Sequence, residues 1–218
     1  MSAPPPAEEA GVLLMVARQP IFDTAGERVG YELLYRADPG ATAAVGTDAE
    51  HMAAEVLAGA LAGLGLESVA GGVPAWLNCP RGMLLAEGWR LFDPREVVIE
   101  VLETVEPDRE VLAACAAARQ AGYRVALDDF VCSPEREALV AVADVLKVDV
   151  LGRAPAEVAA VRAELARFGR TLLAERVEDE AMRRHCEELG FELFQGIYFA
   201  LPETLTRRDL PVQQVAVV

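Results

Sequence analysis

Seven short segments, most of them apolar and strand-like, end in a polar residue. These residues are Glu32, Asn78, Glu100, the pair Asp128-Asp129, Lys147, Glu175 and Gln195. A strand buried on both faces tolerates an acid only at its end, so one acid per strand end predicts that the ends converge on a single polar site. Convergent carboxylates repel one another unless cations lie between them. The sequence therefore predicts a hard divalent metal, as a pair, in a Lewis-acid or water-activating role.

Helical segments alternate with the strand-like ones. A capping-box pattern at residues 47–50 precedes apolar residues at helical spacing up to residue 64. Further helices are predicted from Pro107 to about Gly122, from Pro155 to Gly169, and from about Asp179 to Gly190. An additional strand is predicted at residues 13–17.

This alternation predicts about eight parallel strands with helices outside them. A (β/α)8 TIM-barrel-like single domain fits best, because its catalytic groups collect at the C-terminal ends of the strands. A doubly wound open sheet is the alternative. We expect a disordered tail at residues 1–10, the barrel at 11–205, and a C-terminal tail or linker at 206–218.

Composition excludes several classes of protein. A hydrophobic content of 53% excludes a disordered chain, and a formal net charge of −15 argues against binding to duplex DNA or to anionic membranes. The N-terminal residues lack the basic start and apolar stretch of a signal peptide, and the longest apolar run, around residues 56–66, is too short to span a membrane. We therefore expect a soluble, cytoplasmic protein.

The four cysteines predict neither a zinc site nor disulfide bonds. They are widely scattered, without a Cys-x-x-Cys pair and with only two histidines to assist. Reduced thiols in the core are the expectation.

The polar residues lie in motifs whose order resembles the EAL domain, the family of bacterial cyclic di-GMP phosphodiesterases. Glu32-Leu33-Leu34-Tyr35-Arg36 stands where the family has Glu-Ala-Leu-x-Arg. The other matching motifs are Gln19-Pro20-Ile21, Asn78, Glu100-Val101-Leu102-Glu103, Asp128-Asp129-Phe130, Lys147-Val148-Asp149, Ala174-Glu175-Arg176-Val177-Glu178 and Gln195-Gly196. The similarity covers about residues 15 to 203. It is greatest to the EAL halves of proteins that carry a downstream HDOD domain, a domain we expect to be absent from this chain.

The resemblance implies a role for each matching residue. The ligands of one Mg²⁺ or Mn²⁺ are matched by Glu32, Asn78, Glu100 and Asp128, and those of a second ion by Asp128 and Asp129. The match also places Glu175 at the metals as the general base and Lys147 at the attacking water and the phosphate. Contacts to the nucleotide are implied for Gln19, Arg36 and Gln195, and support of the loop after Asp129 for Glu103 and Glu178. Hard oxygen ligands suit both metals. The implied reaction is hydrolysis of cyclic di-GMP to linear pGpG.

Each motif taken alone has a structural interpretation. Asp128-Asp129 resembles the N-cap of a following helix, and Glu100 and Glu103 resemble solvated residues at a strand exit. Lys147 resembles a structural salt-bridge partner, and Gln195-Gly196 resembles an ordinary turn. The hypothesis of a single functional site fails only if all these structural interpretations are correct at once, so we favour the functional site.

The chain departs from the family pattern after Asp129. Val131-Cys132-Ser133 replaces Gly-Thr-Gly, so the glycines that let this loop fold over the metals are missing, and Arg176 replaces the glycine after Ala-Glu. The alternative function is therefore a catalytically weak or inactive cyclic di-GMP receptor or protein-interaction module. The resemblance also implies a homodimer and a signalling protein partner.

Overall fold

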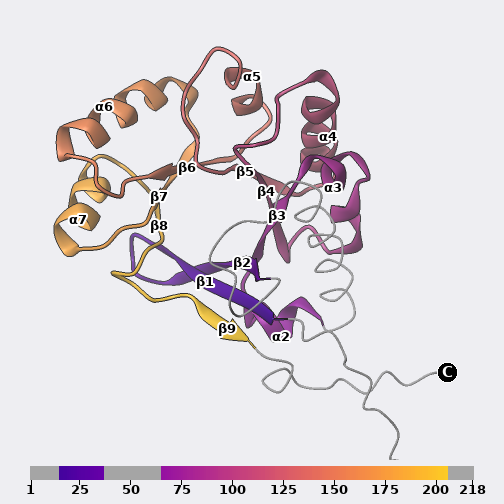
Figure 1. Ribbon diagram of the computed structural model, residues 1–218, viewed down its shortest axis with the longest axis horizontal. Coiled ribbons are helices and arrows are strands. Elements are labelled where there is room, and N and C mark those ends of the chain that lie inside the picture. The colour runs from indigo at the N-terminus through magenta and orange to yellow at the C-terminus, as the bar shows by residue number, and fades with distance from the viewer. Residues whose placement is uncertain (1–14, 37–64, 206–218) are drawn as a thin grey trace, which may run out of the picture.

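The computed structural model describes residues 15–36 and 65–205, which form a ring of strands with helices outside it (Figure 1). The strands are β1 (Met15–Asp23), β2 (Arg28–Arg36), β3 (Ala75–Cys79), β4 (Val97–Val101), β5 (Arg124–Leu127), β6 (Val145–Asp149), β7 (Thr171–Glu175), β8 (Leu193–Phe194) and β9 (Glu203–Leu205). The helices are α2 (Leu66–Ala70), α3 (Arg81–Leu85), η1 (Gly88–Leu91), α4 (Arg109–Gln120), α5 (Glu137–Val140), α6 (Pro155–Leu165), η2 (Ala166–Phe168) and α7 (Glu180–Glu188). None of these helices is long and apolar enough to cross a membrane.

The strands close into a barrel. Each strand from β2 to β8 pairs in parallel with the next, and β1 pairs with both β2 and β8 and so completes the ring. The predicted barrel is confirmed. The expectation that all the strands run parallel is wrong for β1, which is antiparallel to both neighbours because a four-residue turn at residues 24–27 joins it to β2 as a hairpin.

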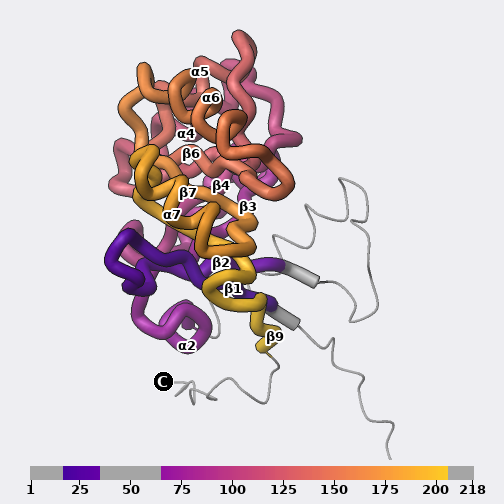
Figure 2. Tube along the Cα trace, turned by 90° about the vertical axis from the view of Figure 1, so that its left-hand side faces the viewer, coloured from indigo at the N-terminus to yellow at the C-terminus, as the bar shows by residue number. Residues whose placement is uncertain are grey.

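The longer helices begin at residues that satisfy their free backbone N–H groups. The Asp108 carboxylate accepts hydrogen bonds from Glu110 and Val111 at the start of α4, and Asp179 accepts one from Met182 in α7. Pro155 occupies the first turn of α6. Figure 2 shows β9 beside β1, while the helices α4, α6 and α7 lie on the side of the barrel formed by β4 to β7.

The start and end of these helices agree with the sequence-based expectation to within two residues, with one exception. The helix expected from Pro155 to Gly169 ends at Leu165, and the 3-10 helix η2 continues from it to Phe168. The start expected at Pro107 is two residues early, because Asp108 is the cap and α4 begins at Arg109. The tails expected at residues 1–10 and 206–218, and the helix expected after residues 47–50, lie outside the described residues.

The barrel interior is filled by a layer of apolar side chains. It consists of Ile21, Trp76, Val98, Ala126, Val145 and Leu173, with Leu193 packed against it, and we call it the apolar layer. Gly30 completes this layer on β2, where a methyl group would lie 2.4 Å from Trp76 Nε1, so the indole occupies the space that a side chain would need. A larger core lies between the outer faces of the strands and the helices.

The chain leaving β8 crosses the loop after β7 at very short range. Val177 N–H donates to the Gln195 carbonyl at 3.0 Å, and an added Cβ on Gly196 would lie 2.1 Å from the Val177 carbonyl oxygen. Only glycine fits there. Two loops of the barrel are thereby joined through their backbones.

We predict that Gly196→Ala destabilises the protein by about 3 kcal/mol or more, because backbone atoms of Val177 cannot move aside as a side chain can. Gly26→Ala is the control: Gly26 also has a positive φ, but its added Cβ would meet nothing within 4 Å, so the loss should be about 1 kcal/mol. Urea unfolding of the two variants measures both values. Equal losses would contradict this account.

Candidate active site

Eight polar residues form a second layer inside the barrel, directly beside the apolar layer. They are Gln19, Glu32, Asn78, Glu100, Asp128, Lys147, Glu175 and Gln195, and we call them the polar layer. Each lies two positions along its strand from Gly30 or a member of the apolar layer, as Asn78 does from Trp76 and Lys147 from Val145. Because strand side chains alternate between faces, residues two apart point to the same side. The strands therefore direct these side chains into the barrel.

Lys147 lies at the centre of the polar layer and is fully buried. Its Nζ donates a hydrogen bond to Asp128 Oδ1 at 2.7 Å. The same nitrogen lies 2.8 Å from Glu100 Oε1, 2.9 Å from Glu175 Oε1 and 3.6 Å from Glu32 Oε1. One ammonium group thus faces four carboxylates, three from different strands and one from the turn directly after β5.

The layer contains more oxygen acceptors than donors. Four buried side-chain oxygens have neither a hydrogen-bond donor nor a cation as partner: Asn78 Oδ1, Glu100 Oε2, Glu175 Oε2 and Gln195 Oε1. A fifth, Glu100 Oε1, has only its ion pair with Lys147. Every buried side-chain oxygen that lacks a partner within residues 15–36 and 65–205 belongs to this layer. Unpaired buried acceptors are costly, and cations bound by oxygen would satisfy them. The donor set therefore fits a hard divalent metal such as Mg²⁺ or Mn²⁺.

The present positions of the side chains do not form a ready metal cage. Among the described residues, no three His, Cys, Asp or Glu side chains are grouped so that they would hold a metal ion as they stand. The Lys147 ammonium lies between the carboxylates instead. The oxygen donors of these residues thus suit a divalent metal, while the cation that they now contact is the Lys147 ammonium group.

Burial controls the protonation of this layer. Removal from water raises the pKa of the Glu100 carboxyl well above its usual range, and the charge of Lys147 only partly offsets this effect. Burial likewise raises the pKa of Glu175 to about 8 against the attraction of Lys147. Burial lowers the pKa of Lys147, but the surrounding carboxylates outweigh it and the net shift is upward. Lys147 is therefore charged at neutral pH.

Gln195 connects the closing strands to the acids. Its Nε2 donates to Glu32 Oε2 at 2.6 Å and to Gln19 Oε1 at 3.3 Å, which joins β1, β2 and the exit of β8. The interpretation of Gln195-Gly196 as a turn holds for Gly196, whose carbonyl accepts from Phe199 N–H, but it does not account for the Gln195 side chain, which is 2% exposed. The interpretation of Glu100 as a solvated residue is also wrong, because its exposure is 0%.

The segment after β5 leaves the barrel in a sharp turn. Asp129 has a left-handed φ of 39° and is exposed next to Asp128. The helix α5 begins only at Glu137, with Arg136 as its cap residue. The interpretation of Asp128-Asp129 as a helix N-cap is therefore wrong. Partial burial and the charge of Asp128 raise the pKa of Asp129.

Comparisons with known proteins assign the chain to a family. The EAL domain family profile matches residues 84–202, which is more than half of the chain. The chain belongs to the EAL domain family. Cyclic di-GMP phosphodiesterase CdgJ of Vibrio cholerae is 30% identical over 212 residues, or 96% of this chain and 49% of that protein. The chain thus spans about half the length of this curated relative.

Solved structures share the EAL fold. The PaMucR phosphodiesterase in complex with c-di-GMP has a TM-score of 0.71 at 21% identity, covering 93% of this chain and 99% of that one. The manganese and cyclic di-GMP complex of Klebsiella pneumoniae BlrP1 has a TM-score of 0.67 at 24% identity, covering 93% and 58%. At these identities the likeness concerns the fold.

Two further residues expected at the site of this EAL domain, Glu103 and Glu178, lie outside the polar layer. Glu103 is exposed, and its carbonyl oxygen accepts a hydrogen bond from Arg136 at 3.4 Å. Glu178 is exposed and forms no hydrogen bond or ion pair with another described residue. Arg36 ends β2, and its side chain lies outside the described part of the chain. The roles expected of these three residues stay predictions.

A pair that sequence reasoning missed joins the last residue of β6 to the loop after β7. Arg176 has a left-handed φ of 55°, and its Nε donates to Asp149 Oδ1 at 2.8 Å while its Nη2 contacts the other oxygen. The sequence offered a signal, because Asp149 closes the Lys147-Val148-Asp149 motif and Arg176 stands where the family has glycine. Arg176 pairs with Asp149 rather than with its neighbour Glu175.

The cysteines Cys79, Cys115 and Cys186 are buried, as expected of core thiols. Cys132 is partly exposed, so the expectation of a core position is wrong for this residue.

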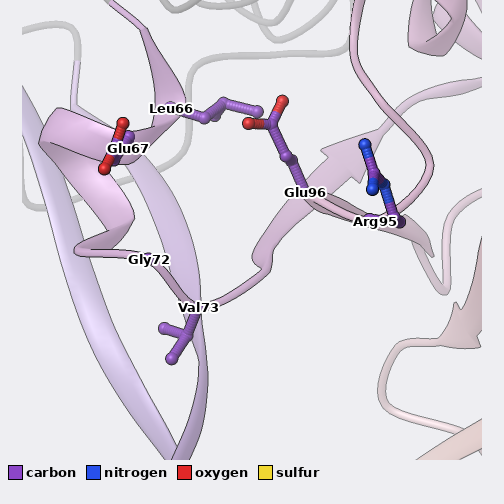
Figure 3. Close-up of a pocket in the computed structure, with 6 residues that line it drawn as sticks. All are labelled: Leu66, Glu67, Gly72, Val73, Arg95 and Glu96. Atoms are coloured by element: carbon purple, nitrogen blue, oxygen red, sulfur yellow. The ribbon is translucent and has the colours of Figure 1, made fainter.

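A pocket lies away from the polar layer. Figure 3 shows this pocket, which is lined by residues that precede β3 and β4, including Val73, Arg95 and Glu96. Because the polar layer lies toward the C-terminal ends of those strands, this pocket is at the opposite end of the barrel.

The raised pKa of Glu175 predicts how metal-free stability depends on pH. Between about pH 4.5 and 8 the folded protein retains a proton that the unfolded chain releases, so the free energy of unfolding falls as pH rises. In EDTA, the melting temperature should be lower at pH 8 than at pH 5.5. Glu175→Gln should flatten this slope, because the amide does not titrate. A melting temperature that rises across the window would contradict the burial of these acids.

Proposed function

We propose that this EAL domain is a metal-dependent phosphodiesterase that hydrolyses cyclic di-GMP to linear pGpG in bacterial second-messenger signalling. The EAL barrel, the 30% identity to a curated cyclic di-GMP phosphodiesterase and the polar layer support this proposal. Cyclic di-GMP is the expected partner. Duplex nucleic acid is not expected, because the chain's excess of acidic residues would repel its phosphates.

The charge of the site is the observation on which the proposal rests. Glu32, Glu100, Asp128, Asp129 and Glu175 carry five negative charges when ionised, and Lys147 supplies one positive charge within the layer. The difference is four charges, which two divalent cations would balance. The four buried oxygens that have neither a donor nor a cation as partner agree with this requirement. A purely structural salt-bridge network has no need of such an excess of acceptors.

The metals would be held by the residues that the family resemblance indicates. Glu32, Asn78, Glu100 and Asp128 would hold one ion, and Asp128 and Asp129 would share the second, with Glu175 alongside. When bound, two such ions supply Lewis-acid stabilisation of a phosphate and lower the pKa of a water molecule. Mg²⁺ and Mn²⁺ both suit these oxygen donors.

Side chains of the polar layer would accept a proton from water and position the phosphate and the nucleotide. Glu175 would accept a proton from the attacking water, a role that its pKa of about 8 suits near neutral pH. Lys147 would donate to the phosphate oxygens as a compact positive charge. Gln195 and Gln19, already joined by a hydrogen bond, together with Arg36 would contact the nucleotide. Attack on phosphorus breaks one phosphodiester bond and opens the ring.

The surroundings of the reaction complete the proposal. Residues 11–205 would form the catalytic domain in the cytoplasm, with Glu103 and Glu178 supporting the loop after Asp129. A homodimer and a signalling partner would regulate the domain. Incubation of the protein with cyclic di-GMP and Mn²⁺, followed by chromatography for pGpG, is the direct test of the activity.

We predict that Asp128→Asn lowers hydrolysis about 100-fold or more and weakens Mn²⁺ binding, because it removes a shared ligand charge without changing volume. Repulsion among the acids around Lys147 also falls. The metal-free variant should therefore melt at the same temperature as the parent or higher, as measured by calorimetry in EDTA. A large loss of melting temperature would instead assign Asp128 a structural role.

We predict that replacing Val131-Cys132-Ser133 by Gly-Thr-Gly raises kcat more than it changes substrate affinity. The acids are in place, while the loop after Asp129 lacks the glycines that allow closure, and Val131 is 63% exposed. Single-turnover kinetics and nucleotide binding separate the two effects. Tight nucleotide binding without pGpG in both proteins would favour the receptor alternative, and no nucleotide binding with metals present would exclude both functions.

A further inference from the structure

Lys147 is the only lysine among the 218 residues, and the other 19 basic side chains are arginines. Arginines form the ion pairs at every other place that the structure describes, such as Arg119 with Asp144 and Arg183 with Glu180. The two side chains differ in shape: an ammonium is a compact point charge on a flexible stem, whereas a guanidinium is a planar fork. The centre of the polar layer is therefore the one position where this chain uses a compact cation.

The contacts of Lys147 resemble those of a bound cation more than those of a pairwise salt bridge. Four carboxylates, three from different strands and one from the turn directly after β5, lie 2.7 to 3.6 Å from one nitrogen, and the Lys147 side chain is fully buried. Without this charge, four acids would face one another in a buried space. The ammonium group thus lies where these carboxylates converge.

We propose that Lys147 is the internal counter-cation of the metal-free site, which holds the acids together and competes with divalent cations for them. This inference rests on the proposed metal site and adds a step to its loading. The first divalent ion must take oxygens that now face Lys147, and the two cations repel each other. Lys147 therefore makes the metal-free barrel stable at the expense of metal affinity.

This competition has two opposite consequences. Removal of the ammonium leaves the acids uncompensated, so the metal-free protein becomes less stable. The same removal makes the site more negative and frees its oxygens, so the first divalent ion binds more tightly. A lysine that acts only on substrate would produce neither effect, and a lysine that helps to hold the ligands in place for the metal would produce weaker metal binding.

The test compares Lys147→Met with the parent and with Arg119→Met, which removes an equal charge from the Asp144 ion pair at the opposite end of the barrel. Calorimetric titration with Mn²⁺ at pH 8 measures affinity, and melting in EDTA measures metal-free stability. We expect Lys147→Met to melt lower and to bind the first Mn²⁺ about tenfold or more tightly, with Arg119→Met unchanged in affinity. Equal or weaker Mn²⁺ binding by folded Lys147→Met would overturn the inference.

A measurement on the parent protein decides the matter even where the variant does not fold. Because the chain has one lysine, labelling with ¹³C,¹⁵N-lysine gives a single set of side-chain NMR signals, those of Lys147. Titration with diamagnetic Mg²⁺ should shift these signals in step with calorimetric binding. Binding with unmoved lysine signals would overturn the inference alone. Absence of any Mg²⁺ or Mn²⁺ binding by the parent would overturn the proposed metal site and this inference together.

Discussion

Five acids and one ammonium group lie at one end of a barrel. Burying these charges opposes folding, and the rest of the structure must supply the free energy that offsets it. Four of the carboxylates face Lys147 directly, three from separate strands and one from the turn directly after β5, where Asp129 also lies. Such a layer opposes folding unless packing beside it is strong. The apolar layer supplies that packing, with the Trp76 indole filling the space beside Gly30. The positions of the charges are therefore set by the apolar side chains two residues away.

Much of this arrangement was predictable from the sequence. Alternating segments predicted the barrel, and the motif order predicted which residues meet. The sequence failed where tertiary pairing decides the outcome. Glu32 and Lys147 were expected at strand ends but lie within β2 and β6, because neighbouring strands continue alongside them. The spacing of two between Val145 and Lys147 marks a shared face, yet nothing local distinguishes the inner face from the outer one. Arg176 and Asp149 are 27 residues apart in the chain, and no local pattern reveals their pairing.

Two left-handed residues direct the chain away from the site. Asp129 and Arg176 each follow a polar-layer residue, Asp128 and Glu175, and each has a positive φ without being glycine. A turn of this kind lets the preceding side chain stay inside the barrel while the backbone leaves it. The conformation is unfavourable for such residues. Arg176 also forms an ion pair with Asp149, so a position that the family fills with glycine here links the loop after β7 to the end of β6.

The antiparallel first strand bears on how the molecule assembles during synthesis. β1 is the first described strand to leave the ribosome, yet its partners include β8 and β9. Phe22 can pair with Phe194, and Val16 with Leu205, only after those late residues have been synthesised. Until then the β1–β2 hairpin carries an unpaired edge, and the polar layer lacks Gln195. Contacts so distant along the chain slow folding and prolong the exposure of strand edges to other chains. The barrel closes, and its site becomes whole, only when nearly the entire domain has been made.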